Sequence, residues 1–271
     1  MNIYYLGPSG SYSEILAKNE FSDHALISVA SFEKVVENVL EDKNAVGILG
    51  IENSSSSSVH TNVDMIFNTN LFIIGEATMS IRLHLIGLMG TNTQDVKEVY
   101  SHPQALAQCT EFIQNNSFIM HPIESTTAAV ERIAKKNKIR IAAIASSQSV
   151  KPGLEIIQKN IANHANNMTR WVFVTSVQNK HVPHANKLTV IFTVKHEPGS
   201  LVKVLQKIAE ARGNLTRIES RPVPGSDWEY QFWIDVEIPK GSMKTFENIL
   251  KKVTNYFRLV GAYKRGTFYT K

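Results

Sequence analysis

Apolar segments alternate with helix-forming segments along the first two thirds of the chain, and this alternation constrains the fold more than any other feature. The predicted strands are residues 3–6, 45–51, 97–100 and 139–145, and the predicted helices are residues 14–19, 59–67, 104–114 and 127–136. Pro103 suits the first position of the third helix. Strands that alternate with helices in this order predict an α/β domain with a largely parallel sheet.

Small, hydroxyl-rich junctions recur where these strands and helices meet. They lie at residues 9–13, 53–58, 101, 125–126 and 146–147. In open α/β sheets ligands bind at the carboxyl ends of the strands, where helix N-termini present free N–H groups and a positive dipole end. The junctions therefore favour a small ligand with several anionic oxygens. The alternative for each junction is an ordinary helix cap, because Ser, Thr and Asn are the usual N-cap residues.

Residues 166–171 place amide, hydroxyl and guanidinium groups at the start of an apolar strand. Arg170 can hold a carboxylate with its planar fork, and Thr169 can donate a hydrogen bond to a neighbouring oxygen. The alternative is that the two Asn residues end a helix and that Thr169 and Arg170 begin a half-exposed strand. Together with the junctions, this segment predicts a binding site for an anion.

Composition excludes several classes of protein. The chain has 271 residues, of which 43% are hydrophobic and 20% charged, as in ordinary globular proteins with one or two domains. Its single cysteine, Cys109, cannot form an internal disulfide and is expected to be buried and inert, which favours a reducing, cytoplasmic setting. Since no basic and apolar leader and no run of eighteen apolar residues occurs, we expect neither export nor a membrane span.

Charge divides the chain into two parts. Residues 1–180 hold 14 Lys and Arg against 16 Asp and Glu, whereas residues 181–271 hold 15 against 8. The basic residues of the second part are scattered, which argues against nucleic-acid binding. Residues 178–187 lack an apolar period and contain a proline, so we expect a linker there. His181 and His184 in this linker are expected to be solvated and not to bind a metal.

The C-terminal part shows its own pattern of elements. Strands are predicted at residues 187–194, 215–221, 228–236 and 258–263, and helices at 199–211 and 242–253. The order βαββαβ is that of a ferredoxin-like α+β fold. Gly199, at the start of the first helix, could admit an amino-acid carboxylate or could serve only the tight turn after Pro198.

Familiar catalytic motifs are missing. The sequence has no glycine-rich dinucleotide or phosphate loop, no zinc-protease helix, no nucleophile elbow and no Cys/His spacing typical of a metal site. If the chain is an enzyme, we expect it to work by positioning and hydrogen bonding, with no cofactor, no metal and no covalent nucleophile.

Several motifs together resemble prephenate dehydratase. They are LGPxGSYS at 6–13, IENS at 51–54, SHPQALAQC at 101–109, ST at 125–126, AAIAS at 142–146 and NxTR at 167–170. Residues 188–264 resemble the ACT regulatory domain that commonly follows, through PGSL at 198–201 and IESRP at 218–222. The chain departs from the family pattern at Ser57, where Gly is usual, at Trp171, where Phe is usual, and at 163–165, where Asp-x-Pro is usual.

The resemblance implies two domains. The catalytic domain would comprise residues 1–180, and its two lobes, at about 1–77 with 169–177 and at about 80–165, would resemble type II periplasmic binding proteins. The ACT domain would comprise residues 187–264. The resemblance also implies conversion of prephenate to phenylpyruvate in a cleft that closes to exclude water. Thr169 would be the donor and Glu52 the reserve acid. The substrate-binding residues would be Arg170, Asn53, Ser54, Ser101, Gln104, Ser125 and Thr126.

By the same resemblance phenylalanine would regulate the enzyme by binding between paired ACT domains of a homodimer or homotetramer. The effector-binding residues would be Gly199, Ser200, Leu201, Asn214, Leu215, Glu219 and Ser220. Two alternatives stay open at this point. The chain could be an arogenate dehydratase, whose substrate carries an amino group in place of the keto group, or a non-catalytic sensor of aromatic acids or amino acids.

Overall fold

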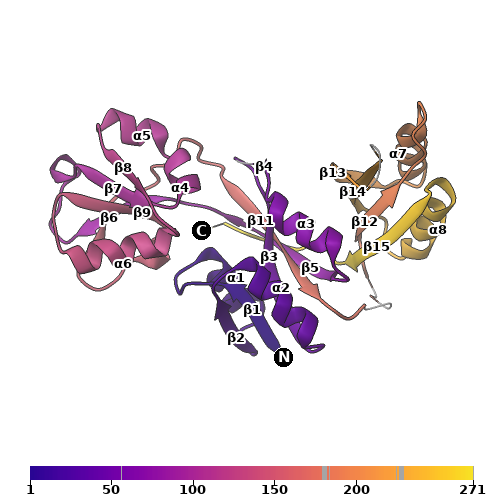
Figure 1. The fold of residues 1–271 in the computed structure, drawn as a ribbon, viewed down its shortest axis with the longest axis horizontal. Coiled ribbons are helices and arrows are strands. Elements are labelled where there is room, and N and C mark those ends of the chain that lie inside the picture. Colours follow the sequence, from indigo (N-terminus) through magenta and orange to yellow (C-terminus); the bar gives the residue numbers. More distant parts are fainter. Residues whose placement is uncertain (56, 179–181, 183, 224, 226–228, 271) are drawn as a thin grey trace.

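The computed structural model describes residues 1–55, 57–178, 182, 184–223, 225 and 229–270. It contains an 11-stranded sheet and a 5-stranded sheet. The small sheet lies at one end of the molecule, the C-terminal helices lie at the other end, and the N-terminal lobe lies between them (Figure 1). Of the sequence predictions, His181, Trp228, the side chain of Ser57 and most of the linker's centre fall outside the described residues.

The N-terminal lobe is built around strand β3, as the long apolar segment predicts. Strand β1 pairs in parallel with β2 and β3, whereas β11 returns from the second lobe and pairs antiparallel with both β3 and β5. The elements are β1 (Asn2–Leu6), α1 (Tyr12–Glu20), β2 (Ala25–Val29), α2 (Phe32–Glu41), β3 (Ala45–Asn53), β4 (Ser57–Ser58), α3 (His60–Asn68), β5 (Phe72–Ser80) and β11 (Met168–Thr175).

The second lobe holds the small sheet in the order β10-β6-β9-β7-β8. Its strands are β6 (His84–Leu88), β7 (Glu98–Ser101), β8 (Ile119–Pro122), β9 (Ile141–Ala145) and β10 (Leu154–Gln158), and its helices are α4 (Pro103–Ala107), α5 (Thr110–Asn115) and α6 (Thr126–Lys136), with short 3-10 turns η1 (Thr93–Asp95) and η2 (Ser147–Ser149). The single helix expected at 104–114 is divided, because the backbone at Cys109 leaves the helical conformation (φ −121°, ψ 19°). Cys109 is buried, as predicted.

The C-terminal domain has the predicted βαββαβ order. Its elements are β12 (Lys187–Thr193), α7 (Ser200–Glu210), β13 (Asn214–Pro222), β14 (Tyr230–Glu237), α8 (Met243–Val253) and β15 (Tyr256–Tyr263). Apolar side chains of α7 and α8 cover one face of this sheet in a core that includes Phe192, Val204 and Phe246. The opposite face packs on the N-terminal lobe, where Ile191, Trp233 and other residues join the same buried cluster as Val172 and Val174.

The two domains share one sheet, which the sequence did not predict. Strand β15 pairs with β5 at Gly261 and Ile73, and a further strand, β16 (Thr267–Tyr269), also pairs with β5. A Cβ atom on Gly266 would lie 1.7 Å from the backbone oxygen of Glu76, and one on Gly261 would lie 2.4 Å from that of Ile73. The close approach therefore requires glycine at both positions.

The chain end is thus anchored to the N-terminal lobe. The Tyr269 hydroxyl donates to Glu20 at 2.6 Å.

No helix in the described part of the chain is long and apolar enough to cross a lipid bilayer.

Candidate active site between the two lobes

A cleft of about 310 Å³ lies between the lobes and gathers most of the predicted hydroxyl-rich junctions. Its lining residues come from both lobes, and they are Leu6, Gly7, Pro8, Ser11, Tyr12, Ser13, Phe32, Gly50, Asn53, Val59, Ile81, Leu83, His102, Gln104, Ala105, Gln108, Glu124, Ser125, Thr126, Thr127, Thr169 and Trp171. The predicted residues Asn53, Gln104, Ser125, Thr126 and Thr169 are therefore brought together in one place.

Thr169 is held by a chain of buried amides. The Asn53 side-chain N–H donates to Thr169 Oγ1 at 2.8 Å and to Asn167 Oδ1 at 2.8 Å, and Asn167 in turn donates to Gln108 at 2.9 Å. Because Thr169 Oγ1 accepts the amide proton and no described residue accepts from Thr169, its own O–H is left to donate to a ligand. The amide chain fixes the hydroxyl in position.

The N-termini of α1, α4 and α6 line the same cleft. Ser11 caps α1 by accepting from the Glu14 N–H at 3.2 Å, His102 caps α4 by accepting from Gln104 at 3.2 Å, and Ser125 caps α6 by accepting from Ala128 at 3.0 Å. Their dipoles supply positive potential to an anion. None of the described lining residues is Lys or Arg. The helix ends are thus the main attraction that the cleft offers to a carboxylate.

His102 enters the cleft as a neutral donor. Burial lowers the pKa of His102, so the imidazole carries no charge near neutral pH. Since Nδ1 accepts from the Gln104 N–H, the ring proton resides on Nε2.

Arg170 and Glu52 do not line the cleft, and the expected roles of both residues as cleft groups require correction. The Arg170 guanidinium points to the other face of β11, where Nε donates to Glu76 at 2.7 Å and Nη1 donates to Asp235 at 2.6 Å. Glu52 is the third carboxylate, 3.3 Å from Nη1. The physical reason is strand alternation, because successive side chains of β11 point to opposite faces of the sheet and only Thr169 and Trp171 face the cleft.

Ser54 and Ser101 were expected to touch the substrate, but they support the cleft from outside its lining. The fully buried Ser101 hydroxyl donates to the Ile144 carbonyl at 2.6 Å and ties β7 to β9. The Ser54 hydroxyl donates to the Asn166 carbonyl at 3.1 Å and accepts from the Met168 N–H at 2.8 Å. Both residues position neighbouring backbone, so their hydroxyls are not offered to the cleft.

The sequence analysis missed several lining residues. Glu124 lies directly before the predicted junction at 125–126, and Tyr12 lies within the junction at 9–13, so their position beside hydroxyl-rich residues was the available signal. The Tyr12 hydroxyl donates to the Arg82 carbonyl at 2.7 Å, across the connection between the lobes, and burial raises the pKa of Tyr12 to about 12. The uncharged Tyr12 side chain therefore links α1 to the connection between the two lobes.

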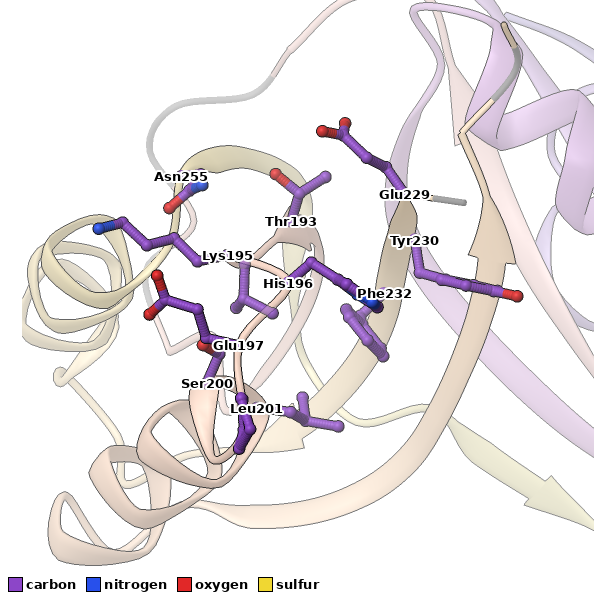
Figure 2. Close-up of a pocket in the computed structure, with 12 residues that line it drawn as sticks. Thr193, Lys195, His196, Glu197, Ser200, Leu201, Glu229, Tyr230, Phe232 and Asn255 are labelled. Atoms are coloured by element: carbon purple, nitrogen blue, oxygen red, sulfur yellow. The ribbon is translucent and has the colours of Figure 1, made fainter. Parts of the chain in front are cut away.

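A second and larger pocket, of about 710 Å³, lies in the C-terminal domain at the start of α7. Figure 2 shows the charged ends of Lys195 and Glu197 on the same side of this pocket, with the Phe232 ring on a strand of the sheet. Ser200 and Leu201 line it, and Gly199 caps α7 in the left-handed conformation at φ 82°.

The other predicted effector residues lie on β13 and do not line this pocket, and Gly199 itself is not a lining residue. Their part in effector binding stays a prediction, because it was expected between two copies of the chain. Asn214 and Leu215 lie at the opposite end of the strand from the pocket, and Ser220 is exposed but does not line it. Glu219 accepts from Ser58 at 2.7 Å and lies 3.2 Å from His60 Nδ1, on the face that packs on the N-terminal lobe. Alternation along β13 separates these side chains.

Comparisons with known proteins agree on one family. Residues 3–179 match the family model for prephenate dehydratase, and residues 188–242 match the model for the ACT domain. A prephenate dehydratase of Methanocaldococcus jannaschii is 34% identical over 269 residues, which cover 96% of this chain and 97% of that protein. A protein of Arabidopsis thaliana named arogenate dehydratase/prephenate dehydratase 2, chloroplastic, is 31% identical over 282 residues, covering 97% of this chain and 72% of that one.

Solved structures share the whole fold. Prephenate dehydratase from Arthrobacter aurescens in complex with L-Phe superposes with a TM-score of 0.85 at 26% identity, over 98% of this chain and 90% of that one. A protein whose title describes a novel type of quorum quenching acylase superposes with a TM-score of 0.84 at 25% identity, over 98% of both chains. The predicted α/β fold class is confirmed, but the sheets are mixed where a largely parallel sheet was expected, because β11, β6 and β10 pair antiparallel with their neighbours. The chain belongs to the prephenate dehydratase family.

Proposed function

We propose that this chain converts prephenate to phenylpyruvate, CO2 and water. The ring carboxylate leaves as CO2, and the electron pair of the broken C–C bond forms the last double bond of the aromatic ring. That electron pair expels the ring hydroxyl, which takes up one proton and departs as water. Aromatisation drives the reaction, so the protein has only to orient the dianion and assist the leaving hydroxyl.

The observation that carries this proposal is the Thr169 hydroxyl, fixed by Asn53 at 2.8 Å and left to donate into the cleft. A threonine hydroxyl is a poor acid. We therefore assign it a hydrogen bond that strengthens as charge develops on the leaving oxygen, with the proton supplied from water or a neighbouring acid. A fixed donor of this kind contributes about 10²–10³ in rate.

The absence of a cation among the described lining residues suits a decarboxylation. The N-termini of α1 and α6 can hold the side-chain carboxylate of prephenate through backbone N–H groups. Because no Lys or Arg occurs among the described lining residues, no ion pair would stabilise the leaving carboxylate in the ground state. Loss of its charge as CO2 then costs less than it would beside a cation.

The pocket beside α7 is the proposed effector site. Lys195 and Glu197 offer opposite charges to the carboxylate and ammonium groups of phenylalanine, and Leu201 and Phe232 offer apolar surface to its ring. We assign catalysis to residues 1–180 and regulation to residues 187–264. Since Asn214, Leu215 and Ser220 lie outside this pocket, their proposed part in effector binding requires a second copy of the chain, in a homodimer or homotetramer.

The buried thiol of Cys109 suits a reducing, cytoplasmic setting.

The deciding experiment incubates the purified chain with prephenate and follows phenylpyruvate, with arogenate in a parallel reaction and phenylalanine titrated into both. Turnover of prephenate supports the proposal, and faster turnover of arogenate makes the chain an arogenate dehydratase. Binding of either acid without turnover indicates a sensor. Cys109 offers no nucleophile for acylase activity, because its thiol is buried, does not line the cleft and has a pKa that burial raises to about 12.

A further inference from the structure

A buried cluster of charges, here called the interdomain joint, connects the catalytic strand β11 to the ACT domain. It consists of Arg170 on β11, Glu76 on β5, Lys187 on β12 and Asp235 on β14. The side chains are 12%, 5%, 7% and 0% exposed, respectively. Two cations face two anions, so the four formal charges of the joint sum to zero although the joint is almost inaccessible to solvent.

Asp235 is the centre of the joint. Its carboxylate accepts from Arg170 at 2.6 Å, from the Thr189 hydroxyl at 2.6 Å and from the Trp233 indole at 3.0 Å. Burial raises the pKa of Asp235, but the positive charges of Arg170, Arg217 and Lys187 outweigh burial and hold that pKa below its usual range. Asp235 is therefore ionised and fully occupied by donors.

Glu76 completes the joint from the catalytic side. Lys187 donates to both of its oxygens at 2.9 Å, and Arg170 donates to one of them at 2.7 Å. Arg170 thus bridges a carboxylate of its own lobe and a carboxylate of the ACT sheet. Removal of one partner would leave an uncompensated buried charge, so the bridge has one strongly preferred geometry.

The neighbouring strand β3 is irregular opposite Arg170. Along the ladder between β11 and β3, Arg170 pairs with Glu52 but Trp171 pairs with Gly50, so Ile51 of β3 is an extra residue. The ladder between β11 and β5 stays in register there, so the bulge belongs to β3, where it changes the local twist of the two strands. Thr169 directly precedes Arg170 on β11, and its side chain faces the cleft while that of Arg170 faces the ACT sheet.

We propose that Arg170 is a positioning residue, which sets the orientation of Thr169 according to how the ACT sheet is docked on β11. The proposal rests on the catalytic role assigned to Thr169. Because Thr169 and Arg170 are neighbours on β11, the Arg170–Asp235 contact holds Thr169 at the angle that the reaction needs. Arg170 then serves the reaction from the face of β11 opposite the cleft, without touching the substrate.

The test compares Asp235→Asn with the parent and with Glu247→Gln, which removes an exposed ion pair to Lys251 on α8 of the same domain. Asp235 lies outside the cleft, so a change there reaches the substrate only through the joint. We expect Asp235→Asn to lower kcat roughly 10-fold or more, in line with the cost of small misplacements, with KM nearly unchanged. Glu247→Gln should retain the parental kcat.

Tyr263→Phe provides a milder perturbation if Asp235→Asn folds poorly. The Tyr263 hydroxyl lies 3.4 Å from Arg170 and 2.8 Å from the Thr189 hydroxyl, and its loss keeps every charge in place. We expect a smaller fall in kcat, again without a change in KM. Near-ultraviolet circular dichroism at the assay temperature confirms that each variant is folded before its kinetics are compared.

A double-mutant cycle of Arg170→Lys with Asp235→Asn separates positioning from substrate binding. If Arg170 acts through Asp235, the losses in kcat are strongly non-additive. An increase in KM for Arg170→Lys that is independent of residue 235 would assign Arg170 to substrate binding and overturn the proposal. Parental kcat in folded Asp235→Asn and Tyr263→Phe would overturn it as well. An inactive parent would instead refute the dehydratase assignment itself.

Discussion

The two faces of strand β11 have opposite chemistry. The face that lines the cleft presents Thr169 and Trp171 and is surrounded by amides, hydroxyls and helix N-termini, with Glu124 as the one acidic residue among the described lining residues. The face that meets the ACT domain presents Arg170 in a cluster of buried charges. The residue that looks most like an anion receptor therefore joins domains, whereas the site for an anionic substrate is nearly free of formal charge.

The difference follows from what each face must do. A joint between domains gains specificity from paired charges, because any displaced partner leaves a charge buried. A cleft that releases CO2 gains from holding a carboxylate weakly in the ground state. Variants that change residues on only one face of β11 test whether the two faces have these separate roles.

The largest expected effect belongs to the cleft face. Thr169→Ala removes the fixed donor, and kcat should fall about 10²–10³-fold with little change in KM, since the donor acts mainly in the transition state. The measurement is the initial rate of phenylpyruvate formation against prephenate concentration. Thr169→Ser is the matched control, because it retains a hydroxyl for Asn53 to hold. Parental kcat in Thr169→Ala would remove the donor role.

The joint predicts a dependence of stability on pH. Asp235 has a pKa in the folded state below its usual value of 3.8, so its ionised form stabilises the fold above that value. The free energy of unfolding should therefore decrease as the pH falls from the usual value through the lower folded-state pKa. Urea unfolding of the parent and of Asp235→Asn at pH 7 and pH 3 measures this dependence. An equal loss in both proteins would exclude Asp235 as its source.

The shared sheet predicts a more moderate effect at Gly266. An alanine Cβ at this position would lie 1.7 Å from the Glu76 backbone oxygen, so β16 must move away from β5. We expect Gly266→Ala to lower the free energy of unfolding by about 1–3 kcal/mol, as overpacked sites do. Thermal unfolding reports the loss, with Lys264→Ala, at a neighbouring exposed position, as the control. Equal melting temperatures for Gly266→Ala and the parent would contradict the close approach.

The smallest effect concerns the cap of α6 at the cleft. Ser125→Ala removes the acceptor for the Ala128 N–H and should cost about 1 kcal/mol of stability. Because α6 begins in the cleft, KM for prephenate should also rise. Ser31→Ala, which uncaps α2 beside the lining residue Phe32 but is not itself a lining residue, should cost similar stability with a smaller change in KM. An equal KM in both variants would argue against substrate contact at α6.

Local pattern was sufficient to predict much of the fold. The apolar strand at 45–51, the helix at 127–136 and the βαββαβ order of the C-terminal domain were all correct, because periodicity and capping are properties of neighbouring residues. The junctions at 9–13 and 53 were predictable neighbours, since β1 and β3 are adjacent parallel strands of one sheet. The junction at 125–126 follows a strand of the other sheet, and only the arrangement of the two lobes brings it to the cleft. The strands that were not predicted include β2, β5, β6, β8 and β10, although β2 (ALISV) and β6 (HLIGL) are largely apolar. Short apolar runs cannot be assigned to a strand by periodicity alone.

The sequence by itself determined the family, the classes of fold and the residue types available to the site. Only the tertiary structure decided which side of β11 faces the cleft, and so separated Thr169 from Arg170. It also decided that β15 and β16 extend the catalytic sheet through Gly261 and Gly266. The physical reason is that alternation along a strand specifies which side chains share a face, but not which other segments of the chain that face contacts. Those partners come from Asp235, 65 residues away along the chain, and from Glu76, 94 residues away.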